Sequence, residues 1–305
     1  MPLKPSPLLS SRYPINDIHL VSRKSPNPAL LVSVFSESQE FYDTKTKASD
    51  IGLVDFGWIF FTNALINSQI QLLLLRSCIG LPKISYFMRT QNRSTVLSGY
   101  ERFDGLLRNT LEIIVGGVLS DRAWLQASLP IKEGGLGISS AVTCAIPAFI
   151  ASIVQTTKFR NTIYPMEHDP LTTCSQESFL AIVTESGEPF DYDVLSEVPK
   201  PQHFLTQCIH TSSKNSLMST SLNDREKARL HSVSINYSGA FLNVVPIKSL
   251  GLAIESKVFS AALRLSLGLI QYQKSSICPV CFCHSDEMGD HAIACASAER
   301  TRCWR

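Results

Sequence analysis

The sequence has almost no excess charge of either sign and lacks the short motifs of the common enzyme classes. Its 28 basic and 26 acidic residues leave a net charge of +2, so overall charge says little about nucleic acid. There is no Gly-x-Ser-x-Gly nucleophile elbow, no His-Glu-x-x-His motif and no pair of carboxylates on a regular element. We therefore expect a protein without enzymatic activity.

Long hydrophobic runs are also missing. The first 14 residues are interrupted by prolines and carry no continuous apolar stretch, so no signal peptide is expected. The most apolar segment, 137–154, contains Ser, Thr and Pro147 and is short for a membrane span, which favours a buried core helix and no membrane association. Four scattered cysteines are typical of reduced thiols in an intracellular protein of the nucleus or cytoplasm: Cys78, Cys144, Cys174 and Cys208.

The remaining cysteines gather near the carboxyl end in a pattern typical of zinc sites. A Cys-x2-Cys pair is followed, after nine residues, by His-x3-Cys, which supplies four donors for a tetrahedral Zn²⁺ ion: Cys278, Cys281, His291 and Cys295. Residues 291 and 295 are four apart, so one helical face can present both. Since the protein fills all four positions, the pattern predicts structural rather than catalytic zinc.

Two details of this predicted site stay open at the level of sequence. Cys283, His284 and Cys303 lie within reach, and each could replace one of the four ligands. Ordinary buried cysteines are the alternative to any metal. Asp290 is expected either to cap the helix that carries His291 or to contact the His291 ring.

The rest of the chain predicts a mainly α-helical protein. Residues 1–50 are rich in Pro and Ser and predict an irregular arm, with one strand possible at 30–35. Helices are expected at 56–76, 83–89, 99–119, 139–155, 224–233 and 255–267, from apolar residues at three- and four-residue spacing. Three glycines at 134–137 predict a tight turn between packed helices. Residues 240–245 resemble a short strand.

Proline-rich residues 161–220 predict a linker with one short helix at 176–183, so the domains are expected at 1–50, 51–160, 161–220 and 221–305. The second of these has more positive than negative charge. A solvated helical face explains it most simply, and a phosphate-binding face is the alternative. The expected nucleic-acid contacts are Arg89, Arg102 and Arg108, with Arg300 and Arg302 in the basic tail.

Three stretches, in this order, resemble a known family. They are LLLLRSCIGLP at 72–82, then WLQASLP at 124–130 with GGLGI at 134–138, and finally GAFLNVVP at 239–246 with LGL at 250–252 and ALRLSLGL at 262–269, running into CPVC at 278–281 and GDHA at 289–292. Together they resemble the region downstream of the polymerase palm in non-LTR retrotransposon reverse transcriptases.

The resemblance implies a helical thumb-like bundle, a loop-rich linker and a small C-terminal zinc knuckle that helps to hold RNA or DNA. The aromatic-x-Asp-Asp turn of the palm and any nuclease lie outside the matching region, so nucleotide addition has no chemical basis here. The function expected is weak RNA or DNA binding by a non-catalytic fragment, with a parent polymerase or another protein as a possible partner. Two alternatives remain: a helical scaffold for protein interactions with purely structural zinc, and a decayed gene product.

Overall fold

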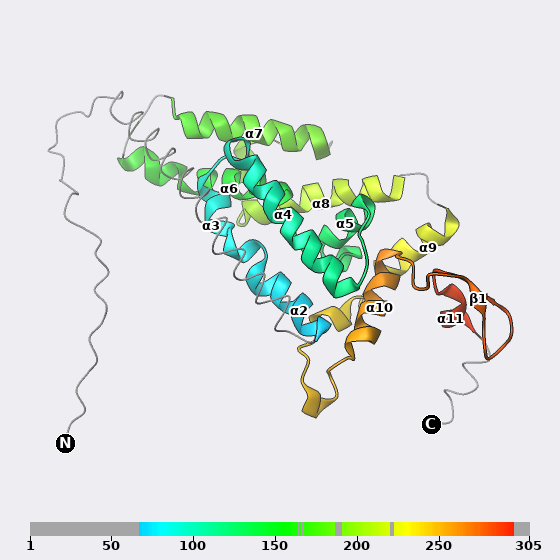
Figure 1. Cartoon of the computed structure of the whole chain (residues 1–305). Helices are drawn as coiled ribbons and strands as arrows, with labels where there is room; N and C mark the ends of the chain where they lie inside the picture. The colour runs from blue at the N-terminus through cyan, green and yellow to red at the C-terminus, as the bar shows by residue number, and fades with distance from the viewer. Residues whose placement is uncertain (1–66, 164, 166–167, 187–190, 220–222, 296–305) are drawn as a thin grey trace, which may run out of the picture. The chain divides into compact units, whose positions relative to one another are not determined.

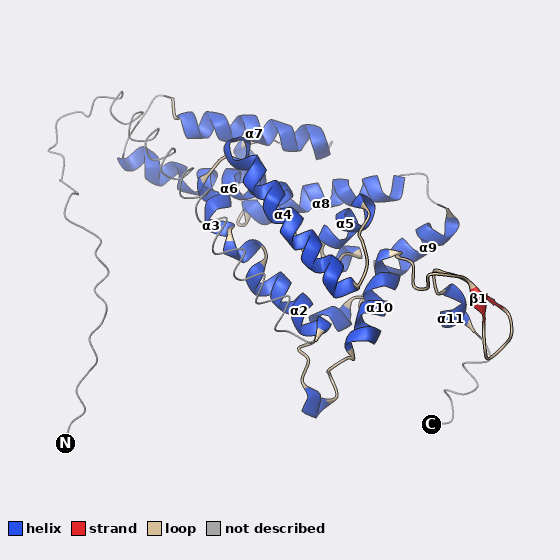
Figure 2. Cartoon of the chain, viewed as in Figure 1, coloured by secondary structure: helices blue, strands red, loops and turns tan. Residues whose placement is uncertain are grey.

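A computed structural model describes residues 67–163, 165, 168–186, 191–219 and 223–295. The chain divides into two compact units, Met1–Thr46 and Lys47–Arg305, and every described residue belongs to the second. The predicted arm at 1–50, its strand at 30–35, the start of the 56–76 helix, Arg300, Arg302 and Cys303 lie outside the described residues. The described chain is mainly helical, as predicted (Figures 1 and 2).

Helix α4 (Arg93–Val115) lies at the centre of a first hydrophobic core. It packs against α2 (Ser68–Leu74), α6 (Ala141–Ile163) and α10 (Ser256–Leu267) (Figure 1). The buried α4 residues recur at helical spacing, which is why this helix presents one continuous apolar face: Phe103, Leu107, Leu111, Ile114 and Val115. The predicted helix at 99–119 is therefore confirmed, although Gly116 in a left-handed conformation ends it earlier.

One buried carboxylate joins α4 to the start of α6. Asp104 accepts hydrogen bonds from the backbone N–H groups of Ala141 (2.6 Å) and Val142 (3.2 Å), and from the Ser140 hydroxyl. Ser140 accepts from the N–H of Thr143 and caps the helix, which begins at Ala141 rather than at the predicted position 139. Burial raises the pKa of Asp104, although these three donors act in the opposite direction.

A second core forms where the sequence predicts a loop-rich linker. Helices α7 (Pro170–Ser186) and α8 (Pro201–Ser219) pack against α6 and bury apolar residues from all three helices, among them Ile150, Ile182 and Leu205. The expectation of one short helix at 176–183 is corrected. Both helices begin at a proline, and proline is favoured in the first turn of a helix because its missing N–H would have no partner there.

Helix α6 alone among the described helices is long and apolar enough to cross a membrane by length and composition. It packs on α3 (Ser85–Thr90), α4, α7 and α8, which is the environment of a core helix. Pro147 lies buried inside it.

The glycine-rich stretch makes the predicted tight turn, after α5 (Asp121–Ser128) and the short 3₁₀ helix Ile131–Glu133. A Cβ at Gly135 would lie 2.0 Å from the carbonyl oxygen of Leu129 and 2.6 Å from that of Gln126, so no larger residue fits. By contrast, the predicted strand at 240–245 is wrong: Ala240–Asn243 is a 3₁₀ helix whose Leu242 packs into the first core.

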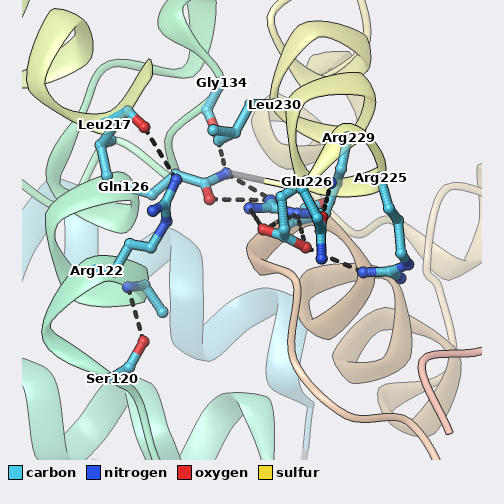
Figure 3. Close-up of polar contacts among 12 residues, drawn as sticks. Ser120, Arg122, Gln126, Gly134, Leu217, Arg225, Glu226, Arg229 and Leu230 are labelled. Carbon is cyan, nitrogen blue, oxygen red and sulfur yellow. Dashed lines mark hydrogen bonds and ion pairs between the residues drawn. The ribbon is translucent and has the colours of Figure 1, made fainter. Parts of the chain in front are cut away.

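Helix α9 (Asp224–Val233), whose bounds match the prediction, is tied to the body by a polar network (Figure 3). Arg229, nearly buried, donates to Gln126 of α5 (2.9 Å) and pairs with Glu226 (2.8 Å), which also pairs with Arg225. Gln126 in turn donates to the carbonyl oxygens of Gly134 and Ser266. These contacts fix the position of α9, whose Arg225 pairs with Asp290 in the C-terminal module, residues 270–295.

Candidate metal centre

The four residues with zinc-ligand spacing converge in space. The sulfur atoms of Cys278, Cys281 and Cys295 and a ring nitrogen of His291 all lie within 4.8 Å of one another. The Cys278 and Cys295 sulfurs are 4.0 Å apart, and the Cys281 sulfur is 3.2 Å from His291 Nε2. Tetrahedral Zn²⁺ with ordinary bond lengths would place two sulfurs about 3.8 Å apart, and a sulfur and a nitrogen about 3.5 Å apart. The donor set and its spacing therefore fit an ion such as zinc.

A small hairpin supplies the first two sulfurs. Strands β1 (Ser276–Ile277) and β2 (His284–Ser285) pair antiparallel on either side of the Cys-x2-Cys turn. The N–H of Cys278 donates to the carbonyl oxygen of Cys283, and the N–H of Phe282 donates to that of Cys278, both at 2.9 Å. Phe282 has a φ of +60°, a conformation rare for a bulky residue, and it closes the turn.

Helix α11 (Asp290–Ala294) supplies His291 and, directly after its end, Cys295. Asp286 caps it: one carboxylate oxygen accepts from the N–H of His291 (2.7 Å) and the other from that of Asp290 (3.0 Å). Asp290 itself is not the cap. Its carboxylate points to α9 and pairs with both Nε and Nη2 of Arg225, the second at 2.7 Å, which corrects the role expected for Asp290.

The electrostatics of the cluster favour a bound cation. Backbone N–H groups of Cys281 and Val280, with the His291 ring, lower the pKa of Cys278 to about 6. The pKa of Cys281 is raised: the N–H of Cys283 favours its thiolate, but burial and the nearby Cys278 sulfur outweigh that effect. Adjacent sulfurs cannot easily ionise together without positive charge between them, and a divalent ion would supply that charge.

Of the alternative ligands, the two that the structure describes lie outside the cluster. Cys283 is exposed, and its sulfur is directed at the carbonyl oxygen of Cys281 (3.7 Å). His284 is exposed on β2. The four residues singled out by spacing are thus the four that come together, and their binding of metal remains a prediction.

The polypeptide around the cluster has almost no apolar core. Between residues 270 and 295, the side chains buried from solvent are those of Cys278, Ser285 and Cys295. Its large apolar residues face outward, with exposed fractions of 69% for Ile277, 53% for Val280, 79% for Phe282 and 63% for Ile293. A segment of this size buries too little surface to fold alone and ordinarily depends on metal or disulfides.

The arginines expected to meet phosphates do not form one face. Arg89 of α3 donates to the side chains of Gln155 and Gln202 and has no carboxylate partner among the described residues. Arg102 is exposed on α4, about 120° around the helix from Arg108 by helical geometry. Arg108 is ion-paired with Asp121 (2.7 Å) and Glu112 (3.6 Å), so its charge is already offset.

Two residues of the centre were missed by sequence reasoning: Asp286, which caps the ligand-bearing helix, and Arg225, which lies 65 positions from its partner Asp290. The spacing of Asp286 before a short helix could have identified the cap, whereas no local signal links residues 225 and 290. Comparison with protein-family models, curated proteins and solved structures finds no match to the chain.

Proposed function

We propose that the chain is a non-catalytic zinc protein that binds RNA or DNA weakly, a fragment of a retrotransposon reverse transcriptase from the region downstream of the palm. The convergence of three sulfurs and one imidazole nitrogen within 4.8 Å carries the zinc part of this proposal. All four donors come from the protein, which leaves no position for a reacting water and suits a structural ion. The family part rests on the ordered resemblance of the three stretches.

Charge on the first part of the helical body, residues 67–163, supports the nucleic-acid part. Residues 67–163 contain ten Lys and Arg residues against five Asp and Glu residues. Of those five acidic side chains, Asp104 caps α6, Glu112 and Asp121 pair with Arg108, and Glu133 pairs with Lys214. Arg160 is offset by Asp169, but Arg89 has only neutral partners among the described residues. Binding of phosphates through such cations would weaken steeply with salt.

A gel-shift titration with single-stranded RNA and with duplex DNA tests this proposal. We expect binding at low salt that weakens as salt is raised, and weaker binding by Cys278→Ser or after zinc chelation. Arg89→Gln should weaken binding of every sequence by a similar factor because a phosphate contact carries no base specificity. Absence of binding to any polynucleotide at low salt would contradict the proposal.

One observation favours a second candidate, a scaffold that binds another protein and uses zinc only to fold. The C-terminal module exposes Ile277, Val280, Phe282 and Ile293, and residues 270–295 carry three acidic side chains against one lysine. An apolar, acidic surface is a poor fit to a polyanion. Under this candidate Phe282→Ser would weaken capture of a protein partner and leave polynucleotide affinity unchanged. If Phe282 instead stacks on bases, the same substitution would lower polynucleotide affinity.

A further inference from the structure

A small recess in the helical body is lined by a half-buried arginine side chain that has no carboxylate partner among the described residues. It lies between the segment after α2 and the glycine-rich turn, has a volume of about 40 Å³, and is bordered by Arg76, Gly80, Leu81, Gly137, Ile138 and Ser139. A water needs roughly 10 to 15 Å³ by this measure, so the recess has room for about three waters. That is the bulk of one small tetrahedral oxyanion.

Arg76 makes two hydrogen bonds and keeps other donors free. Its Nη1 donates to the carbonyl oxygen of Leu242 (2.8 Å), and its Nη2 donates to Asn243 Oδ1 (2.7 Å). A guanidinium has five N–H groups in a fixed fork, and the remaining ones have no partner within the described part of the chain. Both partners are neutral, so the positive charge of Arg76 is not offset.

The backbone holds this guanidinium beside the recess. Arg76 lies in a π-helical turn, Leu75–Ile79, a rare geometry that is frequent at functional sites. Gly80 ends that turn, and a Cβ there would lie 2.6 Å from the carbonyl oxygen of Leu75. Across the recess Gly137 has a φ of +73°, and a Cβ there would lie 3.4 Å from Arg76 Nε. Gly80 thus permits the turn that carries Arg76, and Gly137 leaves space beside the guanidinium.

We propose that this recess binds one phosphate group, with the free N–H groups of Arg76 as its principal donors. Arg is the residue best suited to bidentate contact with a tetrahedral oxyanion. Burial lowers the pKa of Arg76, as expected for a cation that has lost water without gaining a counter-ion. The phosphate could be free or part of a polynucleotide, and in the second case the recess locates one contact of the proposed function.

NMR of the Arg76 Nε–H signal during titration with inorganic phosphate tests the inference. We expect a saturable shift of this signal at millimolar phosphate, while the signal of Arg108, whose charge is offset by Asp121 and Glu112, moves only in proportion to ionic strength. The Nε–H signal is absent from Arg76→Gln, which identifies it, and calorimetry should detect no phosphate binding by that variant. Arg76→Lys should bind at least several-fold more weakly than the natural chain, because an ammonium lacks the fork. An Arg76 signal that moves no more than that of Arg108 would overturn the proposal.

Asn243→Ala separates binding from folding, since Arg76→Gln also removes two bonds to the 242–243 segment. This variant removes one of those bonds but keeps the guanidinium, and it frees Nη2. Phosphate affinity should therefore be retained or increased. A loss as large as that of Arg76→Gln would show that Arg76 only holds the 242–243 segment in place.

Single-stranded RNA, titrated into the same sample, distinguishes the sources of phosphate. Movement of the Arg76 signal by RNA as well as by phosphate assigns the recess to a polynucleotide, and movement by phosphate alone assigns it to a small phosphate compound. Cys278→Ser should leave the phosphate shift intact. Phosphate binding in the recess can thus be disproved while RNA still binds elsewhere on the chain, and it can be confirmed even when no RNA binds.

Discussion

The helical body and the C-terminal module of this chain are stabilised in opposite ways. The body buries long apolar side chains in two clusters, with Leu107, Leu111 and Leu263 fully inaccessible to solvent. The module, residues 270–295, exposes its isoleucines, valine and phenylalanine and buries two cysteines. Apolar burial contributes about 25 cal/mol per Å² to the body, whereas in the module we propose that metal coordination takes its place. One chain would then contain two folding units with different stabilising chemistry.

Replacement of one sulfur should have the largest effect, and it should be confined to the module. Cys278→Ser removes a proposed zinc ligand, and structural zinc sites contribute on the order of 10 kcal/mol to the folding of small modules. We expect zinc content to fall from about one per chain to near zero, and trypsin to cleave rapidly after the exposed Lys274, while the thermal unfolding of the helical body changes little. Metal analysis and limited proteolysis measure these effects.

Cys283→Ser is the matched control, because its sulfur lies next to the site but outside the ligand cluster. It should keep zinc and protease resistance. A variant at position 283 that lost zinc while Cys278→Ser retained it would reverse the ligand assignment.

Removal of the Asp104 carboxylate should produce the converse result in the body. Asp104→Ala leaves the N–H groups of Ala141 and Val142 and the Ser140 hydroxyl without their acceptor, at a cost of about 3 kcal/mol. Chemical denaturation should show this loss, with zinc content unchanged. Glu101→Ala, one turn earlier on the exposed face of α4, should cost less than about 0.5 kcal/mol. Equal losses for the two variants would contradict the capping role.

Loss of the cap on α11 should weaken zinc binding without abolishing it. Asp286→Ala removes the acceptor for the N–H groups of His291 and Asp290, and partners that orient a ligand are worth roughly tenfold or more in metal affinity. Competition with a zinc chelator measures this change. Asp286→Asn, which keeps one acceptor oxygen, should lose less. Unchanged affinity in both variants would mean that the helix needs no cap to present His291.

The number of protons released on zinc binding should differ by less than one between a module that is folded before zinc binds and a module that folds only with zinc. In the folded cluster the pKa of Cys278 is lowered from 9.0 to about 6, so the stability that its thiolate contributes is complete above 9 and is lost as the pH falls through 6. A preformed module would therefore hold Cys278 already ionised near neutral pH. A module that folds only with metal should release nearly one more proton when zinc binds, measurable by calorimetry in buffers of different ionisation enthalpy.

Local sequence patterns were sufficient for much of the fold and for the four residues that converge. Ligand spacing identified the four residues that converge, and periodicity with Gly268 located α10 and its end. Prolines were misinterpreted because Pro170 and Pro201 begin helices rather than interrupt them. Val258, an apolar residue of the predicted helix at 255–267, is 58% exposed. The small apolar faces of α7 and α8 are buried only because they pack against α6, and no local pattern shows that contact.

Polar residues that join distant segments were the other omission. Gln69, a polar residue of the predicted helix at 56–76, is buried and bonds to the backbone of Val244, Leu252 and Ile254. The Arg225–Asp290 pair is of the same kind. Single-sequence patterns show which side chains are polar, but the partners that make burial of a polar group affordable lie more than 60 positions away.

Amide hydrogen exchange before and after zinc chelation tests the central claim most directly, because it observes module and body in one sample. The account predicts that the amides hydrogen-bonded in the module, such as those of Cys278, Phe282 and His291, lose their protection when zinc is removed. Those at the centres of α4 and α6 should keep theirs. Equal protection of the module with and without metal would contradict the account.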